Sequence, residues 1–146
     1  MQPRRTRRRS SAALVLLATA GLAGCGAGED ADVAGVVTRF YTAVATTDGE
    51  AACAALAPDS RSEVVGTDPD GRACPQALLA PEGPGSVLVS RAADATVLEV
   101  RRAGGQAQVV TETDTVFLAV DGTSWVVTAV GCDPRGERPY DCVVEP

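Results

Sequence analysis

Three carboxylates are the residues of this chain best suited to acid–base chemistry. The sequence contains no histidine, so the usual general base near neutral pH and the commonest metal ligand are both missing. Glu112 and Asp114 share one face if the segment from Gln106 to Val120 is a single strand. A two-residue turn at Gly104-Gly105 places Glu99 on that face as well. Three neighbouring carboxylates would raise one another's pKa and could act as acid and base.

A less chemical interpretation suits the same residues better. Long bent strands often carry a β-bulge, and one near Thr113 would turn the carboxylates outward into solvent. Because the chain has few aromatic residues, we expect Tyr41 and Trp125 to pack in the core, with Trp125 between a helix and the sheet. The sequence therefore gives a possible pocket, without predicting catalysis, from five residues: Tyr41, Glu99, Glu112, Asp114 and Trp125.

Residue types exclude several other kinds of site. A Ser-His-Asp arrangement cannot form without histidine, and the chain has neither a phosphate-binding loop nor a dinucleotide fingerprint. The segment from Gly66 to Arg72 contains Asp68, Asp70 and Gly71, as a calcium loop does, but no bidentate glutamate closes the ring. We interpret it as a solvated loop, and no cofactor or metal is predicted.

The five cysteines indicate an oxidising compartment. Cys53, Cys74, Cys132 and Cys142 form an even set, which outside the cytosol predicts disulfides. Three connectivities are possible, and we favour Cys53–Cys74 with Cys132–Cys142 because each bridge closes a local loop rich in turn residues. A metal site built from the four thiolates is the rival, but no closely spaced cysteine pair of the zinc type is present.

The remaining cysteine, Cys25, ends the run Leu22-Ala23-Gly24-Cys25. Five arginines before residue 10 and an apolar run from Ala12 to Ala23 precede it, as in an export signal. The run resembles the lipobox of bacterial lipoproteins, which implies cleavage of residues 1–24 and a thioether-linked diacylglycerol on Cys25. Acyl chains would then hold the protein on the membrane. An uncleaved anchor and an ordinary secretory peptide are the alternatives.

Removal of that segment would make the protein strongly acidic. The 13 basic residues are all arginine, and five of them lie in the segment, which leaves 8 against 19 acidic residues, a net charge of −11. Such a surface is repelled by phosphate backbones and anionic headgroups. Nucleic acid is therefore not expected as a partner.

The first half of the mature chain predicts helices. After a lipidated tether at residues 25–32, apolar residues recur with helical spacing from Val33 to Val44. Asp48 can cap a second helix that runs through Cys53 to Leu56, and Pro58 ends it, with a short helical turn toward Val65. A further short helix begins at Cys74-Pro75. Residues 81–85 form a break.

From Val87 the apolar period changes to two, which predicts strands. Residues 96–100 and 106–120 form the first two, and Asp121-Gly122 is a strong hairpin signal. A two-residue turn there would pair Leu118 with Trp125 and Val116 with Val127. Residues 131–142 are expected to be a loop closed by the second disulfide.

This order of elements resembles the cone-shaped, cystatin-like α+β fold of the nuclear-transport-factor-2-like superfamily over residues 32–130. The resemblance rests on Val36-Val37-Thr38-Arg39-Phe40-Tyr41, the helix start at residues 48–53 and the hairpin that contains Trp125-Val126-Val127. With the lipobox, Gly131-Cys132 and Pro139-Tyr140-Asp141-Cys142, the chain is similar to small lipoproteins of high-GC Gram-positive bacteria. The resemblance implies helices packed on a curved antiparallel sheet over residues 33–146, and no catalytic pattern.

The functional prediction is a lipid-anchored, extracytoplasmic binding or interaction module of the cell envelope that is not an enzyme. Its partners would be the membrane, through Cys25, and an envelope protein. A carrier of a small apolar ligand between helix and sheet is the first alternative. A hydrolase or isomerase that uses Glu99, Glu112 or Asp114 is the second.

Overall fold

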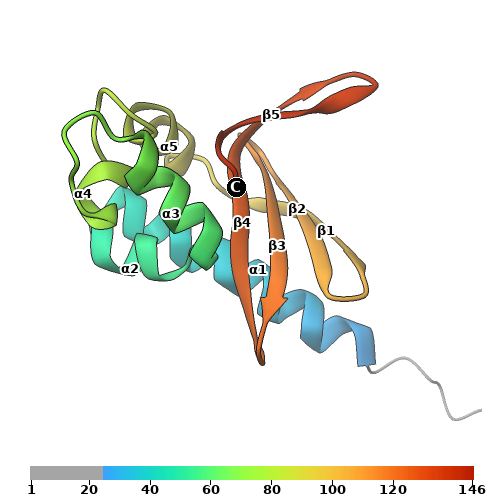
Figure 1. Cartoon of the computed structure of the whole chain (residues 1–146). Coiled ribbons are helices and arrows are strands. Elements are labelled where there is room, and N and C mark those ends of the chain that lie inside the picture. The colour runs from blue at the N-terminus through green and yellow to red at the C-terminus, as the bar shows by residue number, and fades with distance from the viewer. Residues whose placement is uncertain (1–24) are drawn as a thin grey trace, which may run out of the picture.

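The computed structural model describes residues 25–146, and the predicted signal peptide at residues 1–24 lies outside them. Within these residues five helices precede five strands, which confirms the α+β class (Figure 1). The helices are α1 (Cys25–Ala45), α2 (Gly49–Ala54), α3 (Pro58–Thr67), α4 (Cys74–Leu78) and α5 (Gly85–Ala92). The strands are β1 (Val97–Ala103), β2 (Gln106–Thr111), β3 (Thr115–Asp121), β4 (Ser124–Arg135) and β5 (Arg138–Val144).

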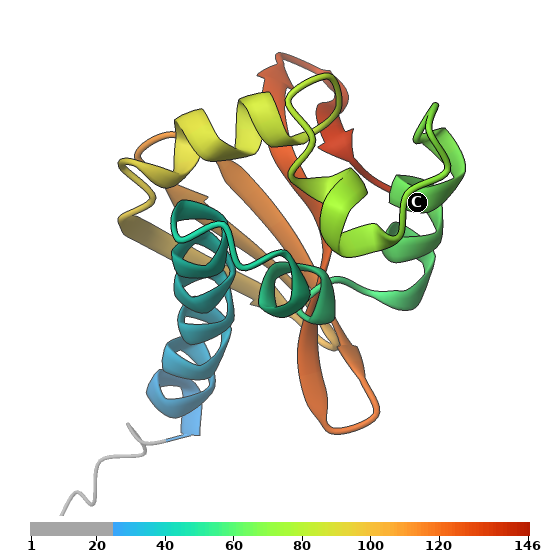
Figure 2. The same ribbon diagram turned by 90° about the vertical axis from the view of Figure 1, so that its left-hand side faces the viewer.

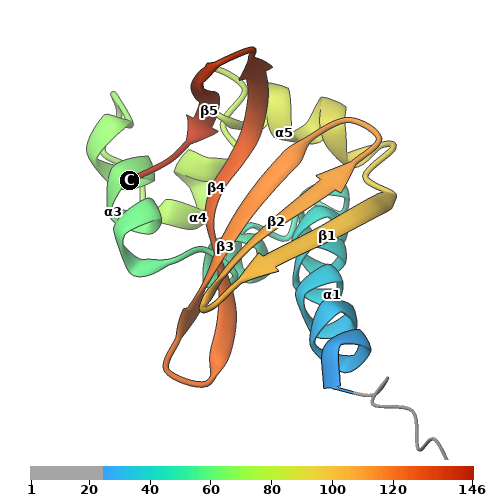
Figure 3. The ribbon, with the colours of Figure 1, turned by 90° about the vertical axis from the view of Figure 1, so that its right-hand side faces the viewer.

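The strands form an open antiparallel meander in the order β1-β2-β3-β4-β5. The helices gather on one face of this sheet (Figure 2), and the opposite face is not covered by any described element (Figure 3). The core lies between the helices and the sheet, and both layers supply side chains to it. Its fully buried residues include Val37, Phe40 and Val44 of α1 and Val109, Val116 and Val127 of the sheet.

Helix α1 begins earlier than the sequence suggested. The apolar spacing from Val33 to Val44 is confirmed, but the polar segment at residues 25–32, expected as a tether, forms the first part of the same helix. A partner on the sheet explains the difference: Arg102 of β1 donates to Glu29 (2.9 Å), to Asp30 (2.5 Å) and to the carbonyl of Gly26 (3.2 Å). These contacts join the beginning of α1 to the edge of the sheet.

Helices α2 and α4 form a disulfide-linked pair. Asp48 caps α2 by accepting a hydrogen bond from the Ala51 N–H (3.0 Å), and Pro75 stands in the first turn of α4, as predicted. The Cys53–Cys74 disulfide joins the two helices, and Cys132–Cys142 joins β4 to β5. Both predicted pairings are therefore confirmed.

The linker from α2 to α3 pairs with β4. Val127 of β4 donates to the Ala55 carbonyl (2.9 Å) and accepts from the Ala57 N–H (2.7 Å). The edge of β4 that β5 leaves free is thus partly covered by this linker, which also brings α3 close to the end of β5.

Three elements predicted for the second half are wrong. Residues 85–92 form helix α5, although Val87 and Val89 alternate as in a strand, because the residues that face the core, Gly85, Leu88 and Ala92, recur at helical spacing. Residues 106–120 are not one strand: the chain reverses at Glu112–Asp114, and β2 pairs with β3. Residues 131–142 form a hairpin that turns at Gly136-Glu137, where Gly136 has φ +67°.

The register of the two flanking hairpins was predictable in part. The Gly104-Gly105 turn places Glu99 opposite Val110, as expected. In the β3–β4 hairpin Asp121 pairs with Ser124, so the turn is Gly122-Thr123. Leu118 therefore pairs with Val127 instead of Trp125. The left-handed φ of +61° at Gly122 suits the first position of such a turn. Because the shift is two residues, the same face stays buried.

We predict that Gly49→Ala destabilises the protein while Gly66→Ala does not. A Cβ at Gly49 would lie 2.3 Å from the Pro75 carbonyl oxygen and force α2 and α4 apart, whereas nothing lies within 4 Å of one at Gly66. We expect a loss of about 1–3 kcal/mol for the first. The second should be neutral or stabilising by up to about 1 kcal/mol, since alanine is the better helix former. Urea unfolding of the oxidised protein measures both, and equal midpoints would contradict the proposed close contact.

Candidate functional site

The turn between β2 and β3 carries Asp114 into the interior. Thr111 and Asp114 hold this turn, because the Thr111 N–H donates to the Asp114 carbonyl (2.8 Å) and the Thr111 hydroxyl accepts from the Asp114 N–H (2.9 Å). Thr113 adds a hydrogen bond from its hydroxyl to the Arg91 carbonyl (2.8 Å). The Asp114 side chain has no exposed surface. The reversal thus buries one carboxylate and leaves Glu112 in solvent.

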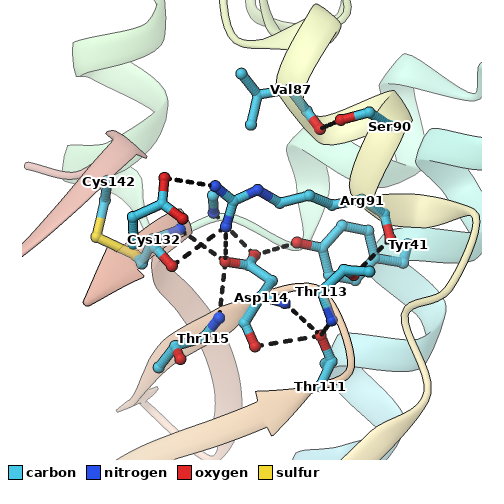
Figure 4. A network of polar contacts seen from close by, with 12 residues as sticks. Tyr41, Val87, Ser90, Arg91, Thr111, Thr113, Asp114, Thr115, Cys132 and Cys142 are labelled. Atoms are coloured by element: carbon cyan, nitrogen blue, oxygen red, sulfur yellow. Dashed lines mark hydrogen bonds and ion pairs between the residues drawn. A yellow bond between two sulfur atoms is a disulfide. The ribbon is translucent and has the colours of Figure 1, made fainter.

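The buried carboxylate accepts five hydrogen bonds (Figure 4). Three come from backbone N–H groups, of Thr115 (2.8 Å), Gly131 (2.9 Å) and Cys132 (2.7 Å). The others come from the Tyr41 hydroxyl and from Nη1 of Arg91 (2.8 Å). We call Asp114 and these five donors the Asp114 network.

Gly131 is required for two of these contacts. Its φ of +73° lies in the left-handed region, which lets two consecutive N–H groups of β4 point at one carboxylate. A Cβ at this position would lie 2.2 Å from Cγ2 of Val143. Both the backbone conformation and the close packing of β5 therefore select glycine here.

Arg91 joins the buried carboxylate to the surface. It stands in the last turn of α5, and its side chain is 12 % exposed. Besides Asp114 it binds the Cys132 carbonyl (3.2 Å) and, through Nη2, the 71 % exposed Asp133 (2.9 Å). One guanidinium thus neutralises a buried charge and docks α5 on β4.

Tyr41 contributes the contact from α1. Burial raises the pKa of its hydroxyl well above the usual range, and the negative charge of Asp114 raises that pKa further. Tyr41 is therefore a neutral hydrogen-bond donor at any physiological pH. A group in this state cannot serve as a base.

The five residues of the predicted pocket do not come together. Only Tyr41 and Asp114 are in contact. Glu99 is exposed on β1 and pairs with Arg101 (2.6 Å), and Glu112 is exposed in the turn. Trp125 is half-buried opposite Val120 near the tip of the β3–β4 hairpin. The bulge that we expected near Thr113 is also absent, because the chain turns there instead.

The Asp114 network has a structural role and is not suited to acid–base catalysis. Five donors occupy a carboxylate that no solvent reaches, so a substrate has no access to it and it has no free oxygen for proton transfer. Within residues 25–146 no three cysteine, aspartate or glutamate side chains converge in a way that could hold a metal ion. Sequence reasoning missed Arg91, whose role depends on the fold of α5.

The surface carries clefts. The first, of about 440 Å³, lies between α3, the loop after it, the α4–α5 connection and the end of β5. The second, of about 480 Å³, is a shallow groove between the C-terminal half of α1 and the segment that joins α5 to β1. A third, of about 280 Å³, opens on β1, β2 and Phe117. Only the second touches a residue of the predicted pocket, Tyr41.

Fold and site together define a disulfide-bonded α+β domain organised around a buried carboxylate. No protein-family model, curated protein or solved structure matches this chain. In the part of the chain that the structure describes, no helix is both long and apolar enough to cross a bilayer. The two disulfides indicate an extracytoplasmic compartment.

We predict that Asp114→Asn destabilises the protein by about 3–5 kcal/mol, because the change removes the buried counter-charge of Arg91, leaving only the exposed Asp133, and turns an amide donor toward backbone donors. Asp133→Asn is the matched control, since Asp133 pairs with the same guanidinium from solvent, and it should cost less than about 1 kcal/mol. Urea unfolding midpoints measure both. Equal effects would show that the network is not the source of stability.

We also predict a stability change at alkaline pH that depends on Tyr41. Since its pKa is raised in the folded protein, the contribution of Tyr41 is constant below the unfolded value of about 10 and falls as the pH rises above it. The expected slope is about 1.4 kcal/mol per pH unit. Tyr41→Phe should remove this slope, measured as urea unfolding free energies from about pH 9 to pH 11, while Tyr140→Phe should retain it. Identical slopes in all three proteins would contradict the raised pKa.

Proposed function

We propose that this protein is a lipid-anchored interaction module on the extracytoplasmic face of the cell membrane. The observation that carries the proposal is the pairing of Cys53 with Cys74 and of Cys132 with Cys142. Those bridges use every cysteine after residue 25, and Cys25 is the residue that the lipobox pattern assigns to acylation. The disulfides and the export signal thus agree on the compartment.

The placement of α1 supports an anchor at this residue. The beginning of α1 projects from one end of the molecule in all three views, while α4, α5 and β5 lie toward the opposite end (Figures 1, 2 and 3). Acyl chains on Cys25 would therefore leave the first cleft and the β4–β5 hairpin facing away from the bilayer. That orientation suits contact with a partner in the envelope.

The placement of the polar residues favours a binding role over catalysis. Asp114 is saturated by its donors, and Glu99 and Glu112 are separate surface residues. The space between α1 and the sheet is filled by buried aliphatic side chains and Phe40, which favours an interaction module over a carrier of an apolar ligand. We retain the likeness to the nuclear-transport-factor-2-like superfamily as part of the proposal, supported by helices that pack on an antiparallel sheet.

Intact mass of the protein extracted from its native membrane tests the anchor. We expect a chain that begins at Cys25, carries two or three acyl groups and gains four hydrogens on reduction of its two disulfides. Cys25→Ser should move the protein from the membrane fraction to the soluble or secreted fraction. Ser62→Ala, a change at an exposed residue of α3, is the control and should leave the protein in the membrane fraction. A Cys25 without lipid, in a protein that still pellets with membranes, would overturn the proposal.

A further inference from the structure

The first cleft has an apolar floor. Val64 of α3, Ala77 of α4 and Val144 of β5 are almost fully buried beneath it, and Pro69 and Pro84 form its walls. Val143 of β5 remains 38 % exposed beside them. A cleft of about 440 Å³ is within the range of ligand-binding pockets, and the exposed part of Val143 gives it apolar surface that a partner side chain can reach.

The rim of this cleft is acidic. Four carboxylates line it, from Glu63, Asp68, Glu82 and Glu145. The cation at this rim is Arg72, which binds Asp68 (2.6 Å) and Glu82 (2.5 Å). Hydrogen bonds from Arg72 lower the pKa of Asp68. Hydrogen bonds from the Glu82 backbone N–H and from Arg72 lower the pKa of Glu82. Both carboxylates therefore stay ionised at neutral pH. Arg72 offsets one of the four negative charges, which leaves the rim with a net charge of −3.

The walls are fixed before any partner arrives. Arg72 ties the loop after α3, through Asp68, to the α4–α5 connection, through Glu82. The Cys53–Cys74 disulfide holds α4, and Cys142, which lines the cleft, is bridged to β4. A preformed site costs a partner little ordering of the protein. The cleft is therefore suited to binding in the conformation that the structure shows.

The edge strand that lines the cleft favours an extended polypeptide. Residues 142–145 line it consecutively, and they belong to or follow β5, an edge strand of the sheet. Edge strands present unpaired backbone groups to a neighbouring chain. The carboxylates do not converge as metal ligands in the described residues, so a bound divalent cation does not explain them. Nucleic acid is repelled by the same charges.

We propose that this cleft, which we name the acidic cleft, docks an extended basic segment of an envelope protein, with an aliphatic side chain between lysine or arginine residues. The aliphatic side chain packs on Val143 and the apolar floor, and the flanking cations pair with Glu63 and Glu145. This inference builds on the proposed interaction module, since it names the surface and the chemistry of the partner.

Binding of a fluorescent peptide tests the inference on the protein purified with its native N-terminus in neutral detergent. The probe is Lys-Arg-Leu-Lys-Arg, and its partner probe has serine in place of leucine. We expect the leucine peptide to bind at least about tenfold more tightly and both to weaken as salt is raised. Equal affinity for the two peptides, or no binding at low ionic strength, would overturn the proposal.

Charge variants locate the binding site. The double change Glu63→Gln and Glu145→Gln removes two exposed rim charges outside the Arg72 contacts, and we expect it to weaken binding about threefold to tenfold. Glu112→Gln with Glu137→Gln removes the same charge from turns elsewhere and should leave affinity unchanged. Equal losses would assign binding to net charge alone and contradict the cleft.

An apolar variant and the mass measurement separate this inference from the anchor. Val143→Ser should abolish the preference for the leucine peptide, and retention of that preference counts against the cleft. Specific peptide binding by a protein whose Cys25 carries no lipid would support the cleft and refute the anchor alone. A lipidated protein that binds neither peptide would refute the cleft alone. So would a sedimentation result that shows self-association of the protein through the cleft.

Discussion

The salt bridge between Arg91 and Asp114 is the interaction on which most of this domain depends. Its two side chains come from the last turn of α5 and from the β2–β3 turn, and the carboxylate also receives donors from α1 and β4. A buried carboxylate is costly unless its charge and its oxygens are satisfied. Helices α1 and α5, the β2–β3 turn and β4 must therefore be in place together for Asp114 to be accommodated. Such a network favours one arrangement of these elements over other compact ones.

The parts of the fold that local signals specify could be predicted from the sequence. Asp48 caps α2 through a contact three residues away, Pro75 begins α4, and Gly104-Gly105 closes the first hairpin. The apolar spacing of α1 likewise needs only the sequence between residues 33 and 44. In each case the determining contacts are a few residues apart.

The parts that were mispredicted depend on distant residues. The turn at Glu112–Asp114 has no glycine or proline, and it is stable because its carboxylate meets Arg91, 23 positions earlier, and Gly131, 17 positions later. The alternation of Val87 and Val89 suggests a strand, yet the segment forms helix α5, and Arg91 binds Asp114 from the last turn of that helix. The acidic cleft was equally hidden, since its rim combines residues from 63 to 145. The residues that interact in these regions lie too far apart in the sequence for a local pattern to reveal them.

The ionic contacts between Arg102 and the first turns of α1 have a mechanical consequence under the proposed anchor. A lipid attached through a flexible linker lets a domain reorient, whereas Cys25, the residue proposed to carry the lipid, begins a helix whose first turns are bound to β1. That helix has 21 residues, about 30 Å of rigid length. The lipid would then hold the domain at a fixed distance from the bilayer. Only partners whose basic segments extend to that distance could reach the acidic cleft.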